Sequence, residues 1–314
     1  MDKSTIVIGI DHGWSGMKTV HEIFTSGCKE ISTEPAFTEN LLEYGGKYYK
    51  IGNRRLEVKN TKVTDENYYM LTLAVVAKEL KIRGKKTAHV LLAVGLPLTK
   101  FGDEKKDFVS YLSKKKEVYF AFEKEKYHIL IENVFVYPQC YVAVIGRIDR
   151  FSEKQLVVDI GSWTVDIMPI INYLSDESVC VTQPHGIITC IQQINKECVR
   201  QLNADMDEYD IQKVMANGGG GLPKKYHDII IKEIHAYCQQ IYHNIRELGY
   251  NMNLTQIIFV GGGAGVMKRF GNLEQRNIQY IEDVKGYEML ENAYLAKAQR
   301  LRWSSFFNTY KEKF

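Results

Sequence analysis

A carboxylate, two hydroxyls and a glycine gather at one corner near the middle of the sequence. Asp159 follows the apolar run 156–158. Gly161 and Ser162 form the corner, and Thr164 opens a second run. The alternation of these runs predicts a β-hairpin with the polar groups at its turn. Amide N–H groups in a glycine turn, a hydroxyl and an acid are what a phosphate chain with a hydrated metal ion needs.

The same plan recurs near the N-terminus. Asp11 follows the apolar run 6–10, and Gly13 and Ser15 lie at the corner. Lys18 lies in the strand that resumes. Either hairpin alone is a weak signal, because any antiparallel hairpin can carry an Asp-x-Gly turn. Two of them about half a chain apart predict two similar halves that face each other across a cleft.

A third glycine element occurs in the segment 257–266. A buried strand there runs into Gly261, Gly262 and Gly263 before an expected helix. Without a Cβ at these positions the backbone can approach a flat base or a ribose closely. The segment is therefore a candidate contact for a nucleoside.

A helix is expected to begin at Pro138 and to extend through Val144 and Ile148, because proline is favoured where the first helical amide has no partner. Gln139 then lies in the first turn. If this helix points its N-terminus at the cleft, the Gln139 amide lies near the terminal phosphate. The alternative is a glutamine that faces solvent.

The rest of the chain alternates strands with helices. Apolar runs and alternation predict strands, and helical periodicity with glycine stops predicts helices. Strands are expected at 89–98, 118–122 and 127–136, a Gly-Gly hairpin at 44–53, and helices at 67–81, 188–202, 209–216, 224–248 and 287–301.

Composition excludes several classes. With 314 residues, of which 45% are hydrophobic, the chain suits two domains. A net charge of +3 gives no strongly basic surface for nucleic acid, and the lysine runs 105–106 and 114–116 are interpreted as solvated faces, or else as a contact with a partner. The six cysteines form no Cys-x-x-Cys pair, which favours reduced thiols and no zinc site. No targeting segment or spanning apolar run is found, so a soluble cytoplasmic protein is expected, with no membrane partner.

Taken in order, the three glycine elements and the helix at Pro138 resemble the actin, sugar kinase and heat-shock chaperone ATPase superfamily. Residues 11–18 are similar to its first phosphate motif, 159–166 to its second and 260–264 to its adenosine motif. Residues 95–99, 46–52 and 292–294 are similar to stretches of the plasmid-segregating bacterial actins of the ParM or StbA type.

The resemblance implies an α/β, actin-like ATPase fold. Two similar lobes, which are duplicated ribonuclease H-like cores, are then expected around a nucleotide cleft. Lobe I is expected at residues 1–155, with a small insert at about 35–66 and a closing C-terminal helix at about 287–314. Lobe II is expected at 156–286, with a helical insert at about 183–254.

The resemblance also implies ligands and roles. Asp11 and Asp159 would hold Mg²⁺ through water, and Gln139 would position the attacking water as the third catalytic residue. Many ParM relatives have a glutamate at that position. The bulky Trp14 and Trp163 depart from the usual small loop residues, and either face the core or narrow the site. Residues implied to bind ATP or ADP are Gly13, Trp14, Ser15, Lys18, Gly161, Ser162, Trp163, Thr164, Gly261, Gly262, Gly263 and Ala264.

The implied function is an ATPase that polymerises into filaments with ATP and Mg²⁺ and drives plasmid segregation, with hydrolysis destabilising the filament. Its partners would be copies of itself and a small ParR-type adaptor, so that centromere-like plasmid DNA is bound only indirectly. Two alternatives remain open at this point. A small-molecule kinase of the superfamily needs a further acid, for which Asp166 is the candidate. A nucleotide-binding cytoskeletal scaffold needs no hydrolysis.

Overall fold

The computed structural model describes residues 5–57, 59, 61–63, 65–144, 153–172, 174–175, 177–219, 221–272 and 276–281. The described part falls into two compact units, one within residues 1–142 and the other within 143–283. The expected closing helix lies outside the described residues. The lobe limits inferred from the sequence stay a prediction.

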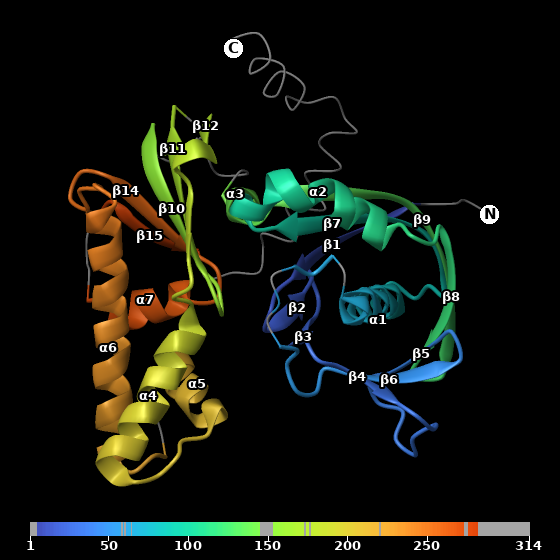
Figure 1. Ribbon diagram of the computed structural model, residues 1–314, viewed down its shortest axis with the longest axis horizontal. Helices are drawn as coiled ribbons and strands as arrows, with labels where there is room; N and C mark the ends of the chain where they lie inside the picture. Colours follow the sequence, from blue (N-terminus) through green and yellow to red (C-terminus); the bar gives the residue numbers. More distant parts are fainter. Residues whose placement is uncertain are drawn as a thin grey trace. The chain divides into compact units, whose positions relative to one another are not determined.

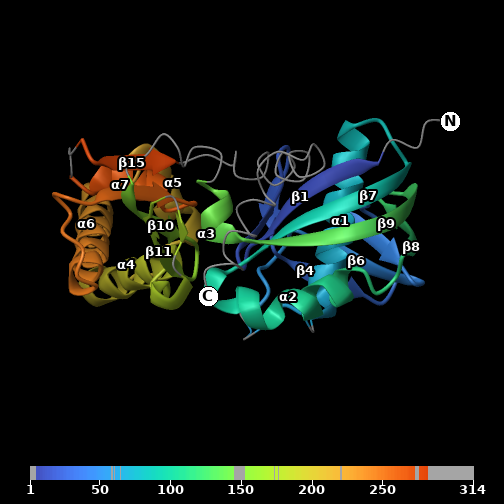
Figure 2. The same cartoon turned by 90° about the horizontal axis from the view of Figure 1, so that it is seen from above.

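The first unit contains a nine-stranded sheet in the order β3-β2-β1-β7-β9-β8-β5-β6-β4. Three adjacent strands of this sheet, β1, β7 and β9, are parallel, and Figure 2 shows them side by side. Parallel strands are buried on both faces, which accounts for the nearly continuous apolar run of β7. The strands are β1 (Ile6–His12), β2 (Gly16–Lys18), β3 (Ile23–Thr25), β4 (Cys28–Ile31), β5 (Leu41–Tyr44), β6 (Lys47–Ile51), β7 (Thr87–Leu96), β8 (Glu117–Phe122) and β9 (Glu125–Pro138).

The curved sheet surrounds helix α1 (Glu66–Ile82), as Figure 1 shows. The helix begins at Asp65, whose side chain accepts a hydrogen bond from the Asn67 amide at 3.0 Å. It contacts β1, β4, β6 and β8, and residues on nearly all of its sides are buried. A helix that is apolar all round must be enclosed in this way.

Helix α2 (Leu98–Leu112) differs from the sequence analysis, which predicted only a lysine run there. Phe108 and Leu112 on this helix are fully buried in the first core, whereas Lys105 and Lys106 face solvent. Helix α3 (Gln139–Val142) is shorter than expected. Val144 lies in a turn, and Ile148 lies outside the described residues.

The second unit contains a six-stranded sheet, ordered β12-β11-β10-β14-β15, with β13 paired to β11. Its strands are β10 (Lys154–Ile160), β11 (Val165–Ile171), β12 (Leu174–Ser175), β13 (Val181–Gln183), β14 (Gln256–Val260) and β15 (Ile278–Ile281), with a short 3-10 turn η2 (Glu177–Val179). Its helices are α4 (Ile187–Leu202), α5 (Glu208–Asn217), α6 (Lys224–Glu247) and α7 (Ala264–Phe270).

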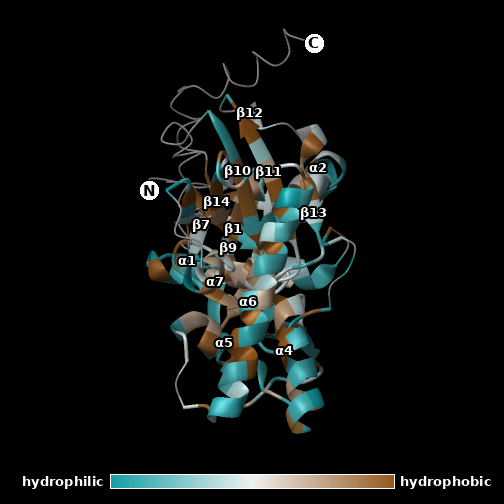
Figure 3. Cartoon of the chain, turned by 90° about the vertical axis from the view of Figure 1, so that its left-hand side faces the viewer, coloured by the Kyte–Doolittle hydropathy of each residue, from teal (hydrophilic) through white to brown (hydrophobic). Residues whose placement is uncertain are grey.

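Helices α4 and α6 pack against each other and are amphipathic. Figure 3 shows hydrophilic residues along their outer sides. Ile194, Ile230, Ile234 and Ile241 on the inner sides join the second core. Nowhere in the described residues is there a helix both long and apolar enough to cross a membrane.

Candidate functional site

The predicted N-terminal hairpin is present in the first unit, formed by β1 and β2. Asp11 and Lys18 face each other across it, with Asp11 Oδ2 3.4 Å from Lys18 Nζ. A Cβ at Gly13 would lie 2.5 Å from the Gly16 carbonyl oxygen, so the turn between them requires glycine. The hairpin therefore presents a carboxylate and an ammonium group beside a tight glycine turn.

Gln139 contacts the acid of this hairpin. Its Nε2 donates to Asp11 Oδ1 at 2.6 Å, although 128 residues separate the two in sequence. Strand β9 ends at Pro138 beside Leu96 of β7, and α3 begins at the next residue. Gln139 thus contacts the acid of the first hairpin, and its expected place near the terminal phosphate stays a prediction.

The hydroxyl group of Ser15 in this turn can form a further hydrogen bond. Its hydroxyl oxygen is buried and has no hydrogen-bond partner among the described residues. The turn itself is fixed, because Ser26 Oγ donates to the Gly13 carbonyl at 2.6 Å and the Ser26 amide donates to the Ser15 carbonyl at 3.1 Å. A buried hydroxyl without a protein partner fits a bound acceptor such as a phosphate oxygen.

A buried histidine lies directly behind the turn. Thr72 Oγ1 donates to the Tyr68 carbonyl at 2.7 Å, so its oxygen accepts the proton on His12 Nε2 at 2.9 Å. Burial, and then the charge of Lys62, lower the pKa of His12 to about 3. His12 is therefore a neutral ring that ties β1 to α1.

Lys62 completes this layer, and sequence reasoning missed it. Its side chain is 5% exposed, and its ammonium group donates to the His12 carbonyl oxygen. The same group lies 4.5 Å from the Trp14 ring centroid and 5.6 Å from that of Tyr68. Trp14 in turn packs edge-on against Tyr68 and joins the first core, as one of its two expected placements required. A lone lysine in a polar segment carries no signal for such a role.

The second hairpin, formed by β10 and β11, is also present as predicted. Asp159 and Asp166 are cross-strand neighbours, and the Gly161 amide donates to the Thr164 carbonyl at 2.9 Å. Asp166, the acid that a kinase would need, accepts hydrogen bonds from Thr164 Oγ1 at 3.2 Å and from Thr182 Oγ1 at 2.5 Å. Asp166 thus helps to hold the hairpin in shape.

Backbone bonds from the start of α4 hold the second turn. The Ile187 amide donates to the Gly161 carbonyl at 3.1 Å, and the Ile188 amide donates to the Ser162 carbonyl at 2.9 Å. The Gly186 amide donates to the Trp163 carbonyl at 3.1 Å. These amides belong to the first turn of α4, where they have no intrahelical partners, so they are available for the loop.

The third glycine element meets the second hairpin within the same unit. Gly261 has a φ of +81°, and a Cβ there would collide with Asp159 Oδ1. The Gly263 amide donates to the Ile160 carbonyl at 2.9 Å. Gly262 is exposed, and a Cβ on it would touch nothing within 4 Å. Asp159 and the glycine turn thus lie against each other, with Gly262 at the surface.

The predicted residues therefore form two groups. The first unit brings together Asp11, Gly13, Trp14, Ser15, Lys18 and Gln139. The second unit brings together Asp159, Gly161, Ser162, Trp163, Thr164, Gly261, Gly262, Gly263 and Ala264. The indole N–H of Trp163 is buried and has no hydrogen-bond partner among the described residues. Sequence reasoning missed Lys62, and it placed Gly95 only in the expected strand 89–98 and in the ParM-like stretch 95–99.

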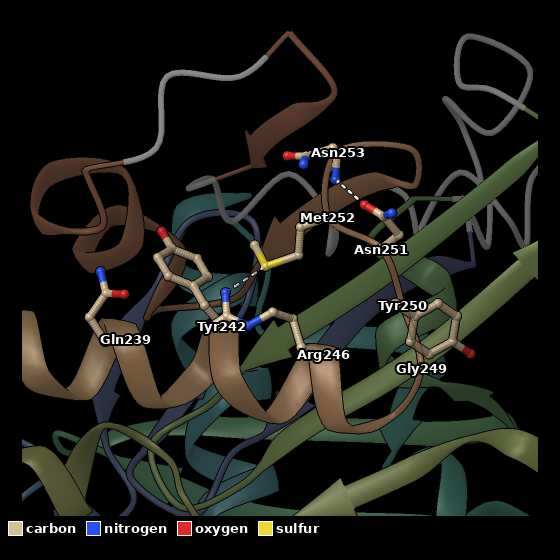
Figure 4. Close-up of a pocket in the computed structure, with 8 residues that line it drawn as sticks. All are labelled: Gln239, Tyr242, Arg246, Gly249, Tyr250, Asn251, Met252 and Asn253. Carbon is tan, nitrogen blue, oxygen red and sulfur yellow. Dashed lines mark hydrogen bonds between the residues drawn. The ribbon is translucent and has the colours of Figure 1, made fainter.

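A cavity of about 470 Å³ lies elsewhere in the second unit, at the C-terminal end of α6 (Figure 4). Arg246 lines it, and its Nη1 contacts the Met252 sulfur at 3.7 Å. The other lining residues come from α6 and from the loop 249–253. None of them belongs to a hairpin or to the glycine turn, so this cavity is not where those residues act.

Comparison with known proteins defines the class of fold. Residues 9–141 match the family described as actin like proteins N terminal domain. No curated protein matches the chain. Across both units the chain has the actin-like fold, so the fold class that the sequence predicted is confirmed.

Particular solved structures are similar over nearly the whole chain. The archaeal actin homologue Ta0583 is 17% identical, with a TM-score of 0.75 over 93% of this chain and 99% of that one. The apo ParM protein of pSK41 is 16% identical, with a TM-score of 0.71 over 94% and 99%. ParM in a 15-stranded filament from Clostridium botulinum is 18% identical, with a TM-score of 0.69 over 91% and 99%. Ta0583 has also been solved in complex with ADP.

Proposed function

We propose that this chain is an actin-like ATPase that binds Mg·ATP through both hairpins, polymerises and hydrolyses the nucleotide. The observation that carries the proposal is the hydrogen bond from Gln139 to Asp11. Asp11 belongs to a hairpin with a tight glycine turn, within an actin-like fold. The ADP complex of Ta0583 gives independent support for a nucleotide as the ligand of this fold.

Each hairpin supplies phosphate contacts in this proposal. The backbone at Gly13 and Gly161, with hydroxyls such as the buried one of Ser15, binds phosphate oxygens. Lys18 neutralises phosphate charge as a point charge. Ser162, Thr164 and Trp163 border the same ligand, whereas Trp14 contributes only its backbone in the first turn, because its ring packs on the first core. Adenine and ribose pack against Gly261, Gly262, Gly263 and Ala264, where the exposed Gly262 permits close approach.

The donor set fits Mg²⁺. That ion usually keeps several waters and needs only one or two carboxylates beside the phosphates. Asp11 and Asp159 would hold it through water. Among the described residues there is no cluster of three or more His, Cys, Asp or Glu side chains that could form an all-protein metal cage. When bound, the ion neutralises phosphate charge.

Hydrolysis in this proposal follows the usual course of phosphoryl transfer to water. The water oxygen bonds to the γ-phosphorus as the bond from that atom to the β–γ bridging oxygen breaks. ADP leaves with the electron pair, and the water proton passes to phosphate or solvent. An amide is no base, so Gln139 orients the water without taking its proton, and turnover should be slow.

The assembly part of the proposal is filament formation coupled to plasmid segregation. ParM from Clostridium botulinum and Alp12 are filament structures with this fold. With a net charge of +3, DNA contact is proposed to run through a small adaptor of the ParR type. Loss of the γ-phosphate lets the nucleotide cleft relax, which weakens the filament.

Sedimentation and phosphate release test both parts. With Mg·ATP, micromolar protein should pellet and release phosphate, and with ADP it should stay in the supernatant. Asp11→Asn and Asp159→Asn should abolish phosphate release. The exposed residues Asp107 and Asp228 give matched controls, and Asp107→Asn and Asp228→Asn should behave as the parent does. Parent-like hydrolysis by folded Asp11→Asn and Asp159→Asn would overturn the proposal.

A further inference from the structure

A glycine at the end of β7 makes room for the Gln139 side chain. A Cβ built on Gly95 would lie 2.6 Å from Gln139 Cγ, 3.4 Å from its Cδ and 3.4 Å from its Nε2. These three atoms are the nearest neighbours of that Cβ. An added methyl group would therefore meet the glutamine side chain first.

Strand pairing explains why Gln139 reaches this position. Gly95 pairs with Tyr137 and Leu96 pairs with Pro138 in the parallel register of β7 and β9. Gln139 follows directly and starts α3, so its side chain can lie back over the end of β7. The adjacent strand β1 carries Asp11 near its own carboxyl end.

Asp11 then decides which way the amide of Gln139 faces. A carboxylate paired with Lys18 can only accept hydrogen bonds, so it must receive the NH₂ group of the amide. With Nε2 held at 2.6 Å from Asp11 Oδ1, the amide oxygen Oε1 is turned away from the acid. That oxygen is left to accept a hydrogen bond from water.

We propose that Gly95 and Asp11 are positioning residues for Gln139: Gly95 supplies the space for its side chain, and Asp11 fixes the amide so that Oε1 faces the attacking water. This proposal rests on the ATPase function proposed above. It gives β7 a part in the hydrolysis step although Gly95 has no side chain to offer.

The variant Gly95→Ala tests whether Gln139 needs the space that Gly95 leaves for its side chain. At saturating Mg·ATP we expect its rate of phosphate release to fall by roughly a hundredfold, the loss expected when a reacting group is displaced by about 1 Å. The KM for ATP and the Kd for a fluorescent ATP analogue should stay within about twofold of the parent values. That change in binding is far smaller than the expected change in rate. The matched control is Gly102→Ala in α2, where a Cβ would meet nothing within 4 Å.

A double-mutant cycle separates positioning from general damage. Because Gly95→Ala is proposed to act only through Gln139, it should cause no further loss when added to Gln139→Ala. Parent-like hydrolysis by Gly95→Ala would overturn the proposal. The proposal would also be overturned if Gly95→Ala lowered the rate of Gln139→Ala by the same factor as it lowers the parent rate. A loss of ATP affinity as large as the loss of rate would overturn it too.

A second measurement does not depend on activity. The side-chain amide resonances of Gln139, identified by their absence in Gln139→Ala, should shift in Gly95→Ala and stay in place in Gly102→Ala. Unchanged resonances in Gly95→Ala would overturn the proposal that Gly95 makes room for the Gln139 side chain. A parent protein that releases no phosphate, together with shifted resonances, would instead sink the ATPase function and with it the role in hydrolysis, while the packing of Gln139 on Gly95 would stand.

Discussion

The two Asp-x-Gly hairpins follow one sequence plan, yet different groups hold their turns. Side chains brace most of the first turn, beside one backbone bond from the Ser26 amide: the Ser26 hydroxyl donates to the Gly13 carbonyl. Lys62, His12 and Thr72 form a buried layer behind it. The second turn is held mainly by backbone amides, which Gly186 and the two residues after it donate from the start of α4. Two hairpins with the same sequence plan can therefore be supported in different ways.

This difference has a consequence for substitution. A side-chain brace fails when a polar group is removed, because its buried partner is then left unsatisfied. A turn held by backbone hydrogen bonds tolerates changes of side chain. It fails when an added atom pushes the two bonded backbone segments apart. The first hairpin should therefore be sensitive to polar deletions, and the second to the replacement of glycine.

The largest expected effect is at Gly186. A Cβ there would lie 2.5 Å from three backbone atoms of Ser162 and Trp163, which cannot rotate away. Gly186→Ala should lower the free energy of unfolding by about 3 kcal/mol, at the upper end of overpacking costs. Urea unfolding gives the value, and hydrogen exchange at the Ile187 and Ile188 amides should accelerate. Gly262→Ala is the control for stability, since its Cβ meets nothing within 4 Å; equal losses in both variants would contradict the backbone brace.

Next in size is the effect of Lys62→Met. The change keeps the apolar stem but removes the donor to the His12 carbonyl and the charge beside Trp14. We expect a loss of about 2 kcal/mol, combining an unsatisfied buried acceptor with a lost cation–π contact. Thermal unfolding measures it, and Trp14 fluorescence, read in a Trp163→Phe and Trp303→Phe background, should shift toward that of a solvated ring.

The same segment offers a control. Lys59 is 56% exposed at its side chain and forms a 2.8 Å ion pair with Asp65, so Lys59→Met should cost no more than about 1 kcal/mol. If Lys59→Met costs as much as Lys62→Met, the buried lysine does not brace the first turn.

A smaller effect is expected for Thr72→Val. The buried His12 ring loses its 2.9 Å partner, at a cost of about 1–2 kcal/mol. Chemical unfolding monitored by circular dichroism measures the loss. Restoration of stability by Thr72→Ser, which returns the hydroxyl, would tie the loss to the hydrogen bond, whereas a persistent loss would assign it to packing.

The smallest effect should come from Thr182 on β13, whose hydroxyl supports the second hairpin. Thr182→Val removes the donor to Asp166, which keeps the Thr164 hydroxyl as a second donor. We expect about 0.5–1 kcal/mol, the net value of one hydrogen bond. Both threonine variants should be compared under one unfolding protocol. A larger loss for Thr182→Val than for Thr72→Val would contradict the view that side chains hold the first turn and backbone amides hold the second.

The sequence was sufficient for features whose signal is local. Both hairpins, the Gly261 turn and the long helices follow from runs of apolar residues and glycine stops. Helix α2 was missed because Pro97 and the lysines around residue 105 masked the spacing of Phe108 and Leu112. That spacing is helical and could have revealed the helix.

The contacts that organise the candidate site were beyond sequence reasoning for a physical reason. Lys62 is 50 residues from His12 in sequence, and Gln139 is 128 residues from Asp11. Each such pair meets only through strand register or tertiary packing, which periodicity does not report. The resemblance could suggest Gln139, but it could not reveal that Gly95 lies beneath its side chain.

The parallel arrangement of β1, β7 and β9 also governs when the site can exist during synthesis. Asp11 leaves the ribosome 128 residues before Gln139 does. Pairing between strands so distant in sequence closes long loops and is slow. A nascent chain that stops short of β9 therefore carries the acid without its glutamine, and the contact between Asp11 and Gln139 forms only after both residues have been translated.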